Sequence, residues 1–261
     1  MFSFSTENND GDVSASVDSN LNNKTTDSDI DVSDYVGIYS REVTLSEPVK
    51  LSDSCTLNNY KVVYQIKKNK SIAKYIYNDC LGTIKLWDGT LAYVSSGGAR
   101  YISANNTNYL FATNTMKEVD GETYTIDDDI NSIREKTNVK NIDITFDDSN
   151  IIIMTYDNLY LISGGTVSIK LGVEYNNNGG DLDKRIYKSS TKYKYNFIVF
   201  SNGDAKNCYD ETIVEDKLLY TIYSVKYNST DKKFGTVKKV VSRNVNDLCT
   251  NYDDDIELLK E

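Results

Sequence analysis

Apolar and polar residues alternate with a period of two along several parts of the chain, and residues 141–146, Asn-Ile-Asp-Ile-Thr-Phe, give the clearest example. This spacing places every second side chain on one face of a β-strand. Runs of β-branched and aromatic residues predict further strands. The strongest are Val36–Leu45, Tyr60–Lys67, Tyr193–Phe200 and Leu218–Tyr227. The best helix candidate, Ile130–Lys136, is short, so the pattern predicts a chain built mainly of β-strands.

One pattern of residues recurs: an apolar run, an aromatic residue, a turn pair, a second apolar run and a closing Gly-Gly. The two best copies are Thr83–Gly98 and Ile151–Gly165, with expected turns at Asp88-Gly89 and Asp157-Asn158. A looser third copy has Asn202-Gly203 at its turn. Because Asp-Gly between apolar runs is a strong hairpin signal, we expect an all-β, repeat-containing fold of antiparallel hairpins. The hairpins form a propeller-like ring, pack as a β-sandwich or follow an irregular meander.

The recurring pattern resembles the blades of β-propellers of the regulator-of-chromosome-condensation type. That resemblance implies a non-catalytic scaffold that binds its partners through the loops of its hairpins.

Residues 1–33 differ in composition from the rest of the chain. Ser, Asn and Asp dominate them, and low hydrophobicity with net negative charge predicts a disordered tail. We therefore expect a β-rich domain at 34–261 behind an acidic tether. The tail resembles the tether that follows the lipidated cysteine of bacterial lipoproteins, which implies that Met1 replaces a removed leader. An ordinary flexible N-terminus is the alternative.

Charge and composition exclude several classes of function. The formal charge of −10 disfavours electrostatic binding to nucleic acid, which requires clustered Lys and Arg. No apolar run approaches the roughly 20 residues of a membrane-spanning helix. The chain has no histidine, which excludes Ser-His-Asp and Cys-His catalysis and zinc sites that contain His.

The four cysteines are widely spaced, and none forms a Cys-x-x-Cys pair. Two disulfides, Cys55–Cys80 and Cys208–Cys249, are our expectation, because each pair lies in its own half of the chain. The alternative is four buried thiols in a reducing compartment.

Aromatic residues provide the candidates for ligand recognition. Trp87, Tyr93, Tyr101 and Tyr109 surround the first expected hairpin, and Tyr156 precedes the turn of the second. Such rings stack on sugars or anchor protein contacts. The alternative is packing across neighbouring strands.

Acidic residues allow two further sites. Asp181 and Asp183 lie in an oxygen-rich loop that could hold calcium, the one cofactor we consider. A glycoside hydrolase would need a pair of carboxylates, and the candidates are Asp127, Asp147, Asp148, Asp181 and Asp183. The alternative is that these residues cap turns or, at 127–129, a helix start.

The sequence favours a non-enzymatic, surface-exposed or secreted binding protein with a protein or carbohydrate partner. A viral or phage structural protein is one alternative, and a carboxylate-dependent glycoside hydrolase is another. The extracellular location rests on the expected disulfides.

Overall fold

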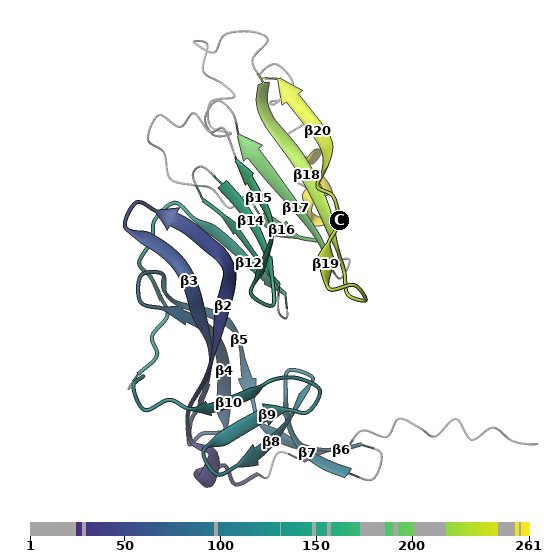
Figure 1. Cartoon of the computed structure of the whole chain (residues 1–261). Coiled ribbons are helices and arrows are strands. Elements are labelled where there is room, and N and C mark those ends of the chain that lie inside the picture. Colours follow the sequence, from purple (N-terminus) through teal and green to yellow (C-terminus); the bar gives the residue numbers. More distant parts are fainter. Residues whose placement is uncertain are drawn as a thin grey trace, which may run out of the picture.

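The computed structural model describes residues 25–27, 30–96, 99–130, 132–147, 150–155, 158–172, 186–189, 193–200, 218–244, 254–255 and 257–261. Every strand pair among them is antiparallel. Figure 1 shows stacked sheets with little helix. The expected all-β fold of antiparallel hairpins is confirmed.

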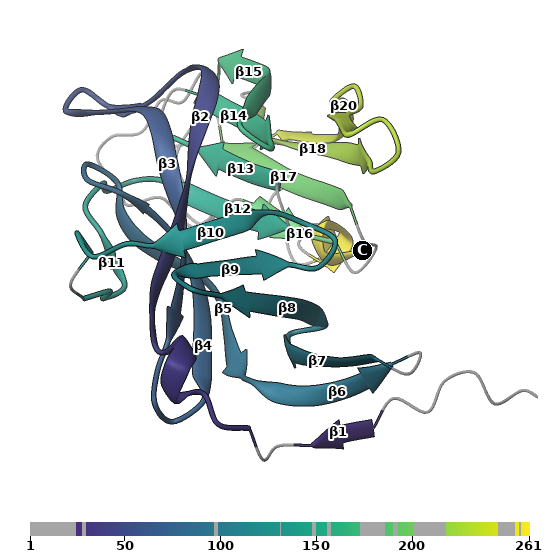
Figure 2. The same ribbon diagram turned by 60° about the horizontal axis from the view of Figure 1, so that its bottom comes forward.

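The largest sheet has 11 strands in the order β1-β6-β7-β8-β9-β10-β2-β3-β4-β5-β11. Its strands are β1 (Thr25–Asp27), β2 (Gly37–Ser52), β3 (Cys55–Ile66), β4 (Ser71–Asn78), β5 (Gly82–Thr90), β6 (Ala92–Ser96), β7 (Ala99–Ala104), β8 (Thr107–Ala112), β9 (Thr115–Glu118), β10 (Thr123–Ile126) and β11 (Lys136–Thr137). A short 3-10 helix, Ser33–Tyr35, precedes β2. We call this the curled sheet, because Figure 2 shows β6–β10 running across the direction of β2–β5.

The curl follows from the connection between β5 and β6. These strands lie near opposite ends of the sheet order, yet a single residue, Leu91, joins them. Leu91 is fully buried, and its amide donates a hydrogen bond to the Lys70 carbonyl (2.9 Å). A one-residue link can join the two ends of the order only if the sheet bends back on itself.

The expected turn at Asp88-Gly89 is wrong. Both residues lie within β5 and pair with β4, where Asp88 faces Ala73 and Gly89 faces Ile72. The chain bends instead at Leu91, because burial of this side chain outweighs the local turn preference of Asp-Gly. Further along, β6 and β7 pair with Ser96 opposite Ala99, and the Gly-Gly pair of this copy lies outside the described residues.

A second sheet contains β12 (Asp143–Asp147), β13 (Asn150–Met154), β14 (Asn158–Ser163) and β15 (Thr166–Gly172). The expected second hairpin is confirmed as a pairing of β13 with β14, because Met154 faces Leu159 and the Thr155 amide bonds to the Asn158 carbonyl (2.8 Å). Of its expected turn pair, Asn158 is the first residue of β14 and Asp157 lies outside the described residues. Gly164 and Gly165 make the next turn with φ of +53° and +89°. Positive φ at both central residues is characteristic of two-residue hairpin turns with the favoured twist.

The second sheet is a central layer, because its two inner strands are buried on both faces. Ile151 and Ile153 belong to the core shared with the curled sheet, whereas Ile152 and Met154 belong to a separate core with the third sheet. Uninterrupted apolar runs are typical of strands covered on both sides. The run Ile-Ile-Ile-Met at 151–154 therefore has a structural cause.

The third sheet contains β16 (Ile186–Lys188), β17 (Lys194–Phe200), β18 (Leu218–Asn228), β19 (Lys233–Phe234) and β20 (Lys238–Asn244). The described residues near the C-terminus are helical at 254–255 and 257–260. Side-chain contacts hold them to the sheet, including one from the Ser189 hydroxyl to the Glu261 carbonyl. Arg243 makes a bidentate ion pair with Asp255 (2.7 and 2.9 Å). The side-chain amide of Asn196 donates a hydrogen bond to the Leu259 carbonyl (3.0 Å).

The expected helix at 130–136 and the expected tail at 1–33 both differ from the structure in the described residues. The helix at 130–136 is wrong: residues 132–135 are irregular, and Lys136 pairs with Thr83 at the sheet edge. Of the expected tail, residues 1–24, 28 and 29 lie outside the described residues. Ile30 and Val32 are 2% and 3% exposed and belong to the core of the curled sheet, so the expected tail contributes to the packing.

Candidate binding cleft and buried carboxylate cluster

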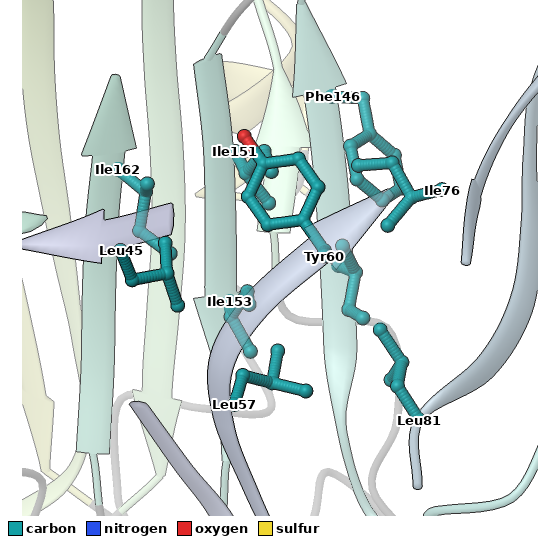
Figure 3. A pocket seen from close by; sticks show the side chains of 10 residues that line it. Leu45, Leu57, Tyr60, Ile76, Leu81, Phe146, Ile151, Ile153 and Ile162 are labelled. Carbon is teal, nitrogen blue, oxygen red and sulfur yellow. The ribbon is translucent and has the colours of Figure 1, made fainter. Parts of the chain in front are cut away.

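The seam between the curled sheet and the second sheet is apolar. Its side chains surround a space of about 10 Å³ (Figure 3). The lining residues are Leu45, Leu57, Tyr60, Ile76, Leu81, Ile144, Phe146, Ile151, Ile153 and Ile162. A space of this size is at the lower limit for one water molecule, and an apolar lining gives water no partners. The seam is therefore packed core that joins the two sheets.

A polar cleft of about 280 Å³ is formed by three segments that are distant in sequence. They are the turn between β2 and β3, the loop before β12, and the turn between β13 and β14. The lining residues are Lys50, Leu51, Ser52, Asp53, Lys140, Asn141, Thr155 and Asn158. A cleft at converging loops on a rigid β scaffold is a common place for ligand binding.

The Cys55–Cys80 disulfide positions two walls of this cleft. Cys55 faces Ser52 across the first turn, and Cys80 lies in the turn between β4 and β5. That second turn holds the loop before β12, because the Asn138 amide donates to the Leu81 carbonyl (2.9 Å) and its side chain donates to the Asp79 carbonyl (3.2 Å). The disulfide therefore connects both loops through one covalent link.

The third wall is held by hydrogen bonds. In the β13–β14 turn the Thr155 hydroxyl donates to the Asn158 carbonyl (3.2 Å) and accepts from the Asn158 amide (3.1 Å). The Tyr160 hydroxyl donates to the Lys50 carbonyl (3.3 Å), which joins this sheet to the first wall.

Three polar side chains of the cleft have no hydrogen-bond or ion-pair partner within the described part of the chain: Lys140, Asn141 and Asn158. Lys50 pairs with Asp53 (2.7 Å). The cleft thus offers one unpaired ammonium and two amides, each of which can both donate and accept. Asn141 has φ of +58°, which asparagine tolerates better than most residues.

A buried carboxylate cluster lies on the concave face of the curled sheet. Oε1 of Glu118 accepts hydrogen bonds from the hydroxyls of Tyr64 and Tyr124 (3.2 Å for Tyr124) and from the Lys74 ammonium (3.1 Å). Burial alone would raise the pKa of Glu118, but the charge of Lys74 and these hydrogen bonds lower it below its ordinary value of 4.5. The carboxylate is therefore ionised near neutral pH.

The tyrosines in and beside this cluster remain protonated, and Tyr64 and Tyr124 donate to Glu118. Burial is the main cause that raises the pKa of Tyr64 and Tyr124, and it raises the pKa of Tyr109 to about 12. Their rings pack edge to face with centroid distances of 4.9 Å for Tyr64–Tyr124 and 5.8 Å for Tyr64–Tyr109. A satisfied ion pair enclosed by aromatic rings rigidifies the interior of the sheet, which is a structural role.

The aromatic residues proposed from the sequence occupy several environments. Trp87 and Tyr109 pack on Tyr64, and Tyr109 is only 1% exposed. Tyr93 is half-buried and stacks beneath Arg100, whose guanidinium carbon lies 3.7 Å from the ring centre. Tyr101 is half-buried on β7. Tyr156 lies outside the described residues, although its neighbour Thr155 lines the cleft.

The two acidic candidates that the structure describes, Asp127 and Asp147, lie at different sheets. The Asp127 carboxylate accepts hydrogen bonds from Ser40 (2.5 Å) and from Lys61 (2.7 Å). Burial would raise the pKa of Asp127, but these two bonds outweigh it and lower the pKa. The expected helix-capping role of 127–129 is wrong, since no helix follows. Asp147 ends β12 opposite Asn150.

Other expected site residues lie outside the described part of the chain: Asp148, Asp181, Asp183, Cys208 and Cys249. Calcium at Asp181 and Asp183 stays a prediction. The described residues contain no cluster of three acidic or cysteine side chains suited to a metal. They also contain no helix with the length and apolarity needed to cross a membrane. The Cys55–Cys80 pairing is confirmed, with 5.4 Å between the Cα atoms.

Sequence reasoning did not single out the cleft. Its residues are mostly polar residues that look ordinary in sequence, and only long-range pairing brings residues 50–53 beside 140–141 and beside Thr155 and Asn158. The buried pair Lys74–Glu118 was also missed. A signal for it exists, because each lies at a position where the strand alternation expects an inward-facing apolar residue.

Neither a protein-family model nor a curated protein matches the sequence.

Proposed function

We propose that this chain is a non-enzymatic binding protein that holds its partner in the polar cleft, and that the partner is a glycan. The observation that carries the proposal is the convergence of three loop segments on an open cleft of about 280 Å³ lined mostly by polar side chains. Unpaired amide and ammonium groups of Asn141, Asn158 and Lys140 match the many hydroxyl donors and acceptors of a sugar.

The location of the protein belongs to the same proposal. A disulfide is typical of the cell surface, a periplasm or the extracellular space, where thiols are oxidised. Cys55–Cys80 also connects two walls of the cleft, so an oxidising compartment would keep the site assembled. We infer a surface-exposed or secreted protein on this basis.

Binding to a panel of immobilised glycans tests the proposal. Asn158→Trp fills the cleft without changing its charge, and it should abolish binding to any glycan that the unaltered protein recognises. Asn108→Trp is the matched control, since Asn108 is a half-buried asparagine on β8 of the curled sheet, away from the cleft. Equal binding by the Asn158 variant, or no binding by the unaltered protein, would contradict the proposal.

A further inference from the structure

The charge balance of the cleft differs in sign from that of the chain. The whole chain carries −10, whereas the cleft contains two lysines and one aspartate. Asp53 neutralises Lys50 by direct contact at 2.7 Å. Lys140 has no carboxylate partner among the described residues, so its ammonium contributes a net charge of +1 to the cleft.

Both amides line the same cleft at one end of the second sheet. Asn141 follows Lys140 directly in the loop before β12, and Asn158 begins β14. Neither side chain is tied to the protein within the described residues. Hydrogen bonds to a charged acceptor are stronger than those to a neutral acceptor. A ligand with an anionic group that accepts from these amides would therefore bind more tightly than a neutral ligand of the same shape.

We propose that the cleft binds acidic saccharides, in which a carboxylate contacts Lys140 and neighbouring hydroxyls bond to Asn141 and Asn158. This rests on the proposed function and adds the chemical class of its ligand. An acidic ligand is unusual for so acidic a protein, because the overall field repels it. Recognition therefore depends on local contacts in the cleft, and it weakens as salt screens them.

Oligogalacturonate provides a direct probe, because its methyl ester has the same sugar backbone without the charge. We expect the acid to bind more tightly than the ester in calorimetric titrations at low salt. Lys140→Gln should weaken binding of the acid about fivefold, the range of an exposed ion pair. Asn141→Asp should weaken it about tenfold, because it retains tolerance of a positive φ while adding a repulsive charge.

Controls separate this inference from the proposed function. Lys117→Gln removes the same charge from the exposed lysine on β9 and should leave binding unchanged. Equal affinity for acid and ester, with no effect of Lys140→Gln, would overturn the acidic ligand while leaving a neutral glycan in the cleft. Binding that survives Asn158→Trp would overturn both. Thermal unfolding of each variant confirms that lost binding is not lost folding.

Discussion

The amide of Ser46 donates a hydrogen bond to the carbonyl of Gly165 (2.9 Å), which joins β2 of the curled sheet to the tight turn of the second sheet. The Ser46 hydroxyl also accepts from the Val167 amide (2.9 Å). Gly165 makes this approach possible: a Cβ there would lie 2.6 Å from the Thr44 carbonyl oxygen. The seam between the sheets is thus fixed by backbone contacts as well as by apolar packing.

Gly165→Ala should destabilise the protein by about 2–3 kcal/mol, because it combines a strained φ of +89° with a clash against the Thr44 carbonyl. Gly164→Ala is the control, since φ is +53° and a Cβ there would meet nothing within 4 Å. It should cost about 1 kcal/mol. Chemical denaturation measures the unfolding free energy of both variants. Equal losses of stability would show that the close approach of Gly165 to the Thr44 carbonyl does not contribute to stability.

Glu118→Gln should destabilise the fold by about 2–3 kcal/mol at neutral pH, because it leaves the buried Lys74 ammonium without a counter-charge. Adding Lys74→Met should recover part of the loss, since the orphaned charge is then removed. Denaturation of the single and double variants measures this. A double variant less stable than the single one would contradict the explanation.

The same carboxylate makes stability depend on pH. The pKa of Glu118 is lower in the folded protein than its ordinary value of 4.5, so its contribution is present above that value and is lost as pH falls through the folded pKa. Unfolding free energies measured between pH 6 and 3 should therefore fall less steeply in Glu118→Gln. An identical slope in both proteins would show that Glu118 does not contribute to the pH dependence of stability.

Replacing Cys55 and Cys80 by alanine should destabilise the protein by about 3–4 kcal/mol, the entropy expected for a crosslink over a separation of 25 residues. The comparison is best made in a Cys208→Ala/Cys249→Ala background, which removes other thiol chemistry. A loss below about 1 kcal/mol would mean that the crosslink constrains little. Glycan binding by the same variant tests its second role in positioning the cleft.

Ile152→Ala and Ile153→Ala should each cost about 2–5 kcal/mol, although the two side chains point to opposite faces of β13. Ile153 packs in the seam with the curled sheet and Ile152 packs against the third sheet. A strand with one solvated face would show a large loss at only one of the two positions. Such asymmetry in denaturation experiments would contradict the central position of the second sheet.

Local patterns were reliable where one preference acted alone. Alternating and β-branched runs identified β2, β3, β12, β17 and β18, and the Asp157-Asn158 signal located a real hairpin. The same signal failed at Asp88-Gly89, because pairing with β4 and burial of Leu91 carried the strand through the turn residues. The short helix expected at 130–136 failed because Lys136 pairs with the edge of β5.

The sequence by itself determined the fold class and the excluded chemistry, since these follow from period-two alternation and the absence of histidine. The Cys55–Cys80 disulfide was one of two alternatives that the sequence left open. Only the tertiary structure decided the curl of the large sheet, the central position of 151–154 and the cleft. The physical reason is that strand order and layer packing are set by contacts between residues that are distant in sequence. They depend on which apolar faces meet, and a local pattern carries no information about its distant partner.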